Sequence, residues 1–109
     1  MMVNDYIKSL KHQAKEKRIP IIQDEVAEFL IKFIQEHDVK KVLEIGTASS
    51  YSAHVMASAG AEVHTIERDK TMIGLANVNI KSSPLEEKII FYAEDALSFK
   101  TTQMFDLIF

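Results

Sequence analysis

The sequence contains no cysteine, and this absence excludes disulfide bonds, thiolate metal sites and cysteine nucleophiles. It also lacks an apolar run long enough to span a membrane, and its N-terminus lacks the apolar core of a signal peptide. We therefore expect a cytoplasmic protein with no membrane partner. An excess of positive charge is missing as well, because the net charge is −3 and the isoelectric point is about 5.8. No basic field over the whole surface points to nucleic acid binding.

The residues that are present suit a small folded domain. A chain of 109 residues allows one domain at most, and the 47% of hydrophobic residues is enough for a core. Charged residues make up 27%, which is an ordinary share for a globular protein. We find no internal repeat and no low-complexity linker.

The stretch KVLEIGTASSYS, from Lys41 to Ser52, is the central feature of the sequence. A short apolar run rich in β-forming residues ends at Gly46, small and hydroxylated residues follow, and a helical pattern begins at Tyr51. This order of strand, tight turn and helix opens a βαβ unit. Such a turn directs backbone N–H groups and a helix N-terminus toward one point, where an anionic or polar ligand group can bind.

Glu67 supports this interpretation from a second place in the chain. It ends the next apolar run, 63–66, and follows Gly46 by about 20 positions. An acidic residue at that spacing is where a carboxylate meets the two hydroxyl groups of a ribose.

Two helical patterns precede the first strand. Residues 5–18 form a loose amphipathic pattern with basic residues near its end, which suits a solvated helix or a basic arm that contacts RNA or caps a substrate cleft. Pro20 ends this pattern. The second pattern is the cleanest in the chain and predicts a helix that packs on the sheet. Its apolar positions are Ile22, Val26, Phe29, Leu30, Phe33 and Ile34.

Strands and helices alternate through the rest of the chain. We expect helices at 51–59 and 70–80, and strands at 62–66, 88–92 and 105–109. Asp69 is the expected N-cap of the later helix. The alternation predicts a parallel sheet with right-handed crossovers and the strand order 3-2-1-4, with a ligand bound over the C-terminal ends of the strands.

The sequence ends on an apolar residue inside the fourth predicted strand. A parallel strand is normally buried on both faces and followed by a helix. We therefore expect these residues to be the N-terminal part of a longer protein, with the sheet truncated after its fourth strand.

The motifs resemble those of a known family. The segments that carry the resemblance are 44–48, 51–52, 65–69 and 94–97. They resemble the S-adenosylmethionine (SAM) motifs of class I methyltransferases, and in particular the cation-dependent group similar to catechol and caffeoyl-CoA O-methyltransferases. The bacterial branch of that group includes a tRNA 5-hydroxyuridine methyltransferase. The resemblance implies an α/β, Rossmann-like fold, with an N-terminal helical arm (1–20) and the N-terminal half of a SAM-binding domain (21–109).

The resemblance also implies which residues contact the cofactor. These candidates are Glu44, Gly46, Thr47, Ala48, Tyr51, Ser52, Glu67, Arg68, Asp95 and Ala96. The first six would surround the methionine part of SAM, with Ser52 hydrogen-bonded to its carboxylate. Glu67 would accept hydrogen bonds from the ribose hydroxyl groups. Asp95 would accept the adenine amino hydrogens, and the adjacent backbone N–H would face a ring nitrogen.

Simpler roles compete for some of these residues. Helix capping accounts for the hydroxyl groups of Ser49, Ser50 and Ser52. Ser50 also departs from the family, in which glycine is usual at this position. A side chain at a backbone position with positive φ destabilises the fold by about 1 kcal/mol or more.

The acidic candidates, and the residues that would line the site beside them, also have alternative roles. Glu67 can be a surface acid paired with a neighbouring basic residue, Arg68 or Lys70, and Asp95 can be a turn residue. In the resembling family the segment before the second helix lies beside SAM, so Ile21 and Ile22 are candidate lining residues, although core packing also explains both.

The resemblance implies methyl transfer from SAM to a hydroxyl group of a catechol-like small molecule or of 5-hydroxyuridine in tRNA. Mg²⁺ or another divalent cation would lower the pKa of that hydroxyl. The catalytic residues and metal ligands are expected beyond Phe109, and the 4 histidines form no pair at metal-ligand spacing. The family often dimerises, so a homodimer is a further expectation.

Two alternatives remain open. The first is a non-catalytic or truncated nucleotide-binding module. The second, an NAD-dependent oxidoreductase, is disfavoured because Ala48 and Tyr51 occupy the second and third glycine positions of G-x-G-x-x-G.

Overall fold

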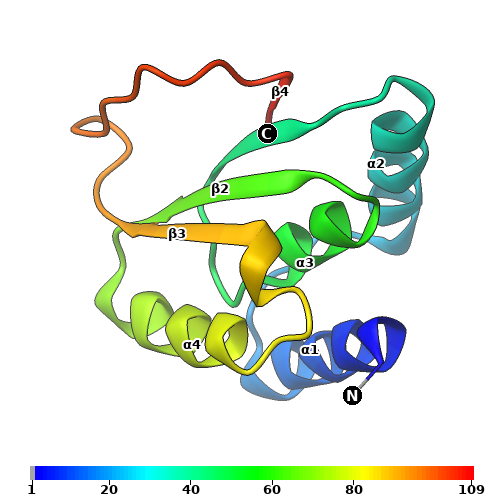
Figure 1. Cartoon of the computed structure of the whole chain (residues 1–109). Coiled ribbons are helices and arrows are strands. Elements are labelled where there is room, and N and C mark those ends of the chain that lie inside the picture. Colours follow the sequence, from blue (N-terminus) through cyan, green and yellow to red (C-terminus); the bar gives the residue numbers. More distant parts are fainter. Residues whose placement is uncertain (1) are drawn as a thin grey trace.

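Four strands form one sheet in the computed structural model, which describes residues 2–109 (Figure 1). They are β1 (Lys41–Ile45), β2 (Glu62–Glu67), β3 (Ile89–Ala93) and β4 (Leu107–Ile108). Their order is β3-β2-β1-β4, and each neighbouring pair is parallel. The predicted parallel sheet and its strand order are therefore confirmed.

Four helices accompany the sheet, and their bounds lie within a few residues of the predicted ones. They are α1 (Val3–Lys17), α2 (Asp24–Glu36), α3 (Tyr51–Ser58) and α4 (Lys70–Lys81), and a 3-10 turn, η1 (Glu86–Lys88), precedes β3. In Figure 1, α1, α3 and α4 lie together on one side of the sheet. Asp69 caps α4 as predicted, because its Oδ2 accepts a hydrogen bond from the Met72 N–H at 3.0 Å.

The main core lies between this helical layer and the face of the sheet turned toward it. Val42 and Val63 of neighbouring strands are fully buried there, as is Met56 of α3. A second cluster docks α1 onto the domain, with Leu10 of α1 in a group that includes Tyr51 and Val55 of α3. Removing this apolar surface from water is the main stabilising term of the fold.

The buried stripe of α2 is narrower than the predicted one. Ala27, Leu30 and Ile34 are buried, whereas Val26 and Phe29 are 38% and 62% exposed. A helix that packs on one neighbour buries only positions three and four residues apart along a single stripe. The apolar residues on the flank of that stripe therefore stay at the surface.

The last strand is shorter than the predicted 105–109. Asp106 lies in a bend and is not part of the strand. Its Oδ2 accepts hydrogen bonds from the N–H groups of Lys40 and Lys41 at 2.9 and 3.0 Å. The strand pairing with β1 therefore begins only at Leu107. The preceding connection is extended and exposed, and its Met104 side chain is 86% exposed.

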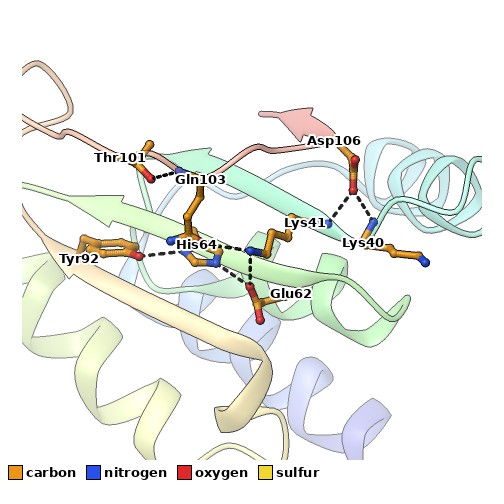
Figure 2. Close-up of polar contacts among 8 residues, drawn as sticks. All are labelled: Lys40, Lys41, Glu62, His64, Tyr92, Thr101, Gln103 and Asp106. Carbon is orange, nitrogen blue, oxygen red and sulfur yellow. Dashed lines mark hydrogen bonds and ion pairs between the residues drawn. The ribbon is translucent and has the colours of Figure 1, made fainter.

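The other face of the sheet is crossed by the segment 94–106, drawn orange to red in Figure 1. Figure 2 shows the polar contacts beneath it. His64 is buried, with Nδ1 hydrogen-bonded to the Tyr92 hydroxyl at 2.9 Å and Nε2 to Glu62 Oε2 at 2.8 Å. Lys41 Nζ donates to Gln103 Oε1 at 2.9 Å and so ties the segment to the sheet. Every polar group named here has a partner.

Within residues 2–109, no helix combines the length and the apolar character needed to cross a lipid bilayer.

Candidate functional site

The turn after β1 is held in an unusual backbone conformation at the C-terminal edge of the sheet. Gly46, Ala48 and Ser50 have φ angles of 92°, 49° and 80°. The N–H groups of Gly46 and Thr47 both donate to the Ile66 carbonyl, at 2.9 and 3.1 Å, and so fasten the turn to β2. A Cβ on Gly46 would meet no atom within 4 Å. The positive φ, and not lack of space, therefore favours glycine at this position.

Two cavities adjoin at this turn, and both are bordered by Ile45 and Gly46. The first has a volume of about 320 Å³ and is lined by Pro20, Ile21, Ile22, Glu44, Ile45, Gly46, Thr47, Ala48, Ser49, Tyr51, Ser52 and Phe109. The second has a volume of about 290 Å³ and is lined by Ile45, Gly46, Ile66, Glu67, Arg68, Glu94, Asp95, Ala96 and Leu97. Together they lie at the C-terminal ends of β1, β2 and β3, where ligands bind in parallel α/β sheets.

The cofactor-binding candidates all line these two cavities. The first six of them border the first cavity, and the other four border the second. The residues expected around the methionine part of SAM and those expected around its ribose and adenine therefore lie in separate, adjoining cavities. Ile21 and Ile22 line the first cavity as well as packing in the cluster around α1.

Glu67 lines the second cavity, and its carboxylate is hydrogen-bonded to the backbone of Ala48, which lines the first. Its Oε1 accepts a hydrogen bond from the Ala48 N–H at 2.8 Å, and Oε2 accepts from the Arg68 and Asp69 N–H groups at 3.2 and 3.0 Å. Among residues 2–109 it forms no ion pair with Arg68 or Lys70. Arg68 approaches Asp95 instead, with Nη1 and Oδ2 3.4 Å apart. The interpretation of Glu67 as a paired surface acid is therefore wrong.

Asp95 is a turn residue at the edge of the second cavity. Its Oδ1 accepts a hydrogen bond from the Leu97 N–H at 3.0 Å, as expected of a turn residue. The same side chain borders the second cavity, beside Ala96.

Glu44 is a buried carboxyl group in the floor of the first cavity, 1% exposed. The Thr65 hydroxyl donates to its Oε1 at 2.6 Å, and the Ser52 hydroxyl donates to its Oε2. Burial raises the pKa of Glu44 to about 7, although both hydrogen bonds oppose the shift. Its charge therefore changes near neutral pH. Thr47 is hydrogen-bonded to Thr65 at 2.6 Å, so its side chain belongs to the same buried network.

The serines of the turn do not cap α3, contrary to the simpler expectation. Ser50 is the N-cap residue, but its side chain forms no capping hydrogen bond. The Ser52 hydroxyl is donated to Glu44. The hydroxyl groups of Ser49 and Ser50 are buried and have no hydrogen-bond partner among residues 2–109. A buried hydroxyl without a partner destabilises a fold, so two of them side by side require an explanation.

The residues that line the cavities but were not among the candidates from the sequence include Ser49 and the apolar residues Ile45 and Leu97. Ile45, at the end of β1, is 50% exposed, and Leu97 is 92% exposed. The available signal was the run of hydroxylated residues after Gly46, which we had assigned to capping. Exposure of apolar side chains at a strand end cannot be recognised before the sheet is assembled.

No three acidic or histidine side chains within residues 2–109 come together as a group able to hold a metal ion.

Comparison with known proteins agrees with the geometry of the turn and the cavities. The sequence profile of a family described as O-methyltransferase matches residues 2–109, which is nearly the whole chain. The chain belongs to this O-methyltransferase family. A structure from Staphylococcus aureus, provisionally described as a caffeoyl-CoA O-methyltransferase, has 31% sequence identity and a TM-score of 0.88. The match covers 94% of this chain and 51% of that protein. The Rossmann-like methyltransferase fold is thereby confirmed.

Two further proteins are similar to this chain. An O-methyltransferase from Bacillus cereus, solved in complex with SAH, shares the fold with a TM-score of 0.81 at 22% identity. A protein-L-isoaspartate O-methyltransferase from Shewanella woodyi is 32% identical over 88 residues, which are 81% of this chain and 42% of that protein. The chain thus spans about half the length of the proteins it matches.

Proposed function

We propose that this chain forms the SAM-binding part of an O-methyltransferase. The observation that carries the proposal is the pair of adjoining cavities at the strand ends, with the Glu67 carboxylate in the second cavity and hydrogen-bonded to the backbone of Ala48 in the first. A cofactor with a charged amino acid part and a nucleoside part suits two cavities of this kind. SAM, when bound, supplies a sulfonium-activated methyl group for transfer to a nucleophilic oxygen.

The residues of the second cavity fit a nucleoside. Oε1 of Glu67 accepts one backbone N–H group and Oε2 accepts two, so one of the roughly four lone-pair sites of the carboxylate, on Oε1, remains to accept a hydrogen bond from a ribose hydroxyl group. Asp95 retains acceptor capacity on Oδ2 for an adenine amino group. Ala96 and Leu97 supply the small and apolar surface that a purine ring requires.

The residues of the first cavity fit a carboxylate. Ser49 borders this cavity and has a hydroxyl group without a partner. The N-terminal end of α3 adds the partial positive charge of a helix terminus. Ser52 was the expected donor, but its single hydrogen is directed to Glu44. We therefore propose that the Ser49 hydroxyl, which is fully buried in the free chain, turns toward the carboxylate when the cofactor binds.

In this proposal the chain acts by positioning. Its residues hold the cofactor at a fixed place above the sheet, and the apolar wall formed by Ile21 and Ile22 limits access of water from one side. The methyl acceptor stays a prediction from the family resemblance, either a catechol-like small molecule or 5-hydroxyuridine in tRNA. The described residues do not provide a set of ligands for a divalent cation. We assign no step to one, and a cation requirement and a homodimer remain predictions for the whole protein.

The alternative, a non-catalytic nucleotide-binding module, is favoured by one observation. Ser50 carries a side chain at φ 80° and a buried hydroxyl without a partner, at the turn that the cofactor must approach. If this strain distorts the turn, SAM affinity is lost although the fold is kept.

A calorimetric titration of SAM into the chain, with NAD as the control ligand, tests the proposal. We expect saturable binding of SAM and none of NAD. Glu67→Ala should weaken SAM binding at least tenfold, about 1.4 kcal/mol, because the ribose acceptor is removed. Glu28→Ala is the matched control, since Glu28 is exposed on α2 and lines neither cavity. A folded chain that binds neither ligand would favour the non-catalytic module.

A further inference from the structure

The turn that borders the first cavity is held from behind by two buried side chains. Asn79 of α4 donates a hydrogen bond from Nδ2 to the Ser49 carbonyl at 2.8 Å. His54 of α3 is hydrogen-bonded through Nδ1 to the Ser50 carbonyl at 2.7 Å. Because a carbonyl only accepts, His54 Nδ1 carries the hydrogen, and Nε2 accepts from the Ser83 hydroxyl at 2.8 Å. Asn79 and His54 are 4% and 0% exposed.

Asn79 also binds α1, which lies on the outside of the molecule. Its second Nδ2 hydrogen is donated to Gln13 Oε1 at 3.0 Å, and Gln13 Nε2 donates to Asn79 Oδ1 at 3.3 Å. The Tyr6 hydroxyl donates to the backbone carbonyl of Asn79 at 2.5 Å. One amide group thus divides its two hydrogens between the turn and α1. Neither Tyr6 nor Gln13 lines either of the two cavities at the turn after β1.

The same helix leads into the opposite wall of the first cavity. Pro20, Ile21 and Ile22, which line that cavity, directly follow the end of α1. Lys11 of α1 pairs with Asp24 at the start of α2 at 2.6 Å, so the segment between the helices is fastened at both ends. The position of α1 therefore determines one wall of the cavity directly and the other through Asn79.

We propose that Asn79 is a positioning residue that couples the docking of α1 to cofactor binding at the turn after β1. The proposal rests on the function proposed above. With Gln13 in place, the Asn79 amide is held in the orientation that binds the Ser49 carbonyl. Without it, the amide rotates, and the carbonyl between the strained residues Ala48 and Ser50 loses its partner. Backbone in sparsely populated regions persists only where its surroundings fix it, so the turn then relaxes away from the binding conformation.

Linkage makes the coupling reciprocal. If docked α1 strengthens cofactor binding, bound cofactor must strengthen the docking of α1 by the same factor. A partner that pulled α1 away would weaken cofactor binding without touching either cavity.

The test is a set of SAM titrations on the full chain, at a temperature where circular dichroism shows every variant folded. We expect Asn79→Ala to weaken SAM binding at least tenfold and Gln13→Ala about threefold. In the Asn79→Ala background, Gln13→Ala should have no further effect, because the coupling passes through the amide. Asn77→Ala is the matched control on the same helix, since the Asn77 side chain forms no hydrogen bond among residues 2–109, and its affinity should equal that of the wild type.

A second readout separates positioning from mere stabilisation. SAM should slow amide hydrogen exchange within α1 in the wild type and lose this effect in Gln13→Ala. This measurement also decides the question if Asn79→Ala does not fold, because Gln13 lies on the surface helix.

Unchanged SAM affinity in folded Gln13→Ala, or losses that add fully in the double variant, would overturn the coupling while leaving the proposed function intact. Absence of SAM binding by the wild type would overturn both.

Discussion

Glu44 near the end of β1 and Glu62 at the start of β2 are both carboxylates of the sheet, but their surroundings shift their pKa values in opposite directions. Burial raises the pKa of Glu44 to about 7, and its donors are only hydroxyl groups. The hydrogen bond from His64 lowers the pKa of Glu62. Both residues take part in networks of several side chains, so the number of hydrogen bonds does not explain the difference.

The difference between the two pKa shifts corresponds to the different faces and ends of the sheet at which Glu44 and Glu62 lie. Around Glu62 and His64, beneath the segment 94–106, each polar group has a partner (Figure 2). Around Glu44, the turn contains two non-glycine residues with positive φ and two buried hydroxyl groups without partners. Features that destabilise a fold collect where a ligand needs them. The comparison therefore favours the end of the sheet at Glu44 as the ligand-binding end proposed above, and a structural role for the network of His64.

The largest expected effect comes from the charge of Glu44. Its pKa in the folded state, about 7, lies above the unfolded value of 4.5, so the resulting stabilisation is complete below pH 4.5 and is lost as the pH rises through about 7. Between about pH 5 and pH 8, the free energy of unfolding of the wild type should fall relative to that of Glu44→Gln by on the order of 2–3 kcal/mol. Urea unfolding of both proteins at the two pH values measures this.

The titration of His54 changes the free energy of unfolding with pH in the opposite sense, and its effect cancels between the wild type and Glu44→Gln. Burial lowers the pKa of His54 below 6.5, so its contribution is present above pH 6.5 and is lost as the pH falls below that value. It is present in both proteins and drops out of their difference. A difference that does not change with pH would show that Glu44 is not the titrating group.

His64→Leu should have the next largest effect, and on stability alone. The substitution leaves the Tyr92 hydroxyl and the Glu62 carboxylate without their buried partner, which should lower the free energy of unfolding by about 2 kcal/mol. SAM affinity, measured by calorimetry on the folded variant, should stay within about twofold of the wild type. Weakened SAM binding at unchanged stability would contradict the division between the two regions.

The sequence predicted the sheet and its strand order from periodicity, and its resemblance to a family supplied ten of the residues that line the two cavities, but not Ile45, Ser49 or Leu97. It did not predict the bend at Asp106, since a side chain that bonds the backbone of Lys40 and Lys41 depends on a contact between residues distant in sequence. The buried stripe of α2 was misjudged at Phe29 for a related reason. Which flank of an apolar face is covered depends on the neighbouring element.

The serines illustrate the limit within the site itself. Local rules assign hydroxyl groups at a helix start to capping, and these rules hold when the N-cap backbone is extended. Ser50 instead has a left-handed conformation, with φ 80° and ψ 11°, and its side chain forms no capping bond. The resemblance to a family with glycine there had indicated the positive φ. Nothing in the sequence indicated that Ser49 would remain without a partner.

Ser50→Gly should stabilise the chain by about 1 kcal/mol, because it removes both the strain of a positive φ and a buried hydroxyl without a partner. Ala48→Gly is the matched comparison, with φ 49° but no hydroxyl group, and should gain less. Thermal or urea unfolding of the wild type, Ser50→Gly and Ala48→Gly measures the order of their stabilities. A loss of stability in Ser50→Gly would mean that the Ser50 side chain supports the turn in a way that these contacts do not explain.

The smallest effect compares the two hydroxyl groups directly. Ser49 borders the first cavity and Ser50 does not, although both are buried without partners. If Ser49 donates to the carboxylate of the cofactor, Ser49→Ala should weaken SAM binding about threefold, close to 0.6 kcal/mol, without lowering stability. Ser50→Ala, which keeps a side chain at the same backbone position, should leave the affinity within about twofold. Equal affinities for the two variants would remove Ser49 from the site and leave both unpartnered hydroxyl groups as features of the fold, with Glu67 alone to define the functional end of the sheet.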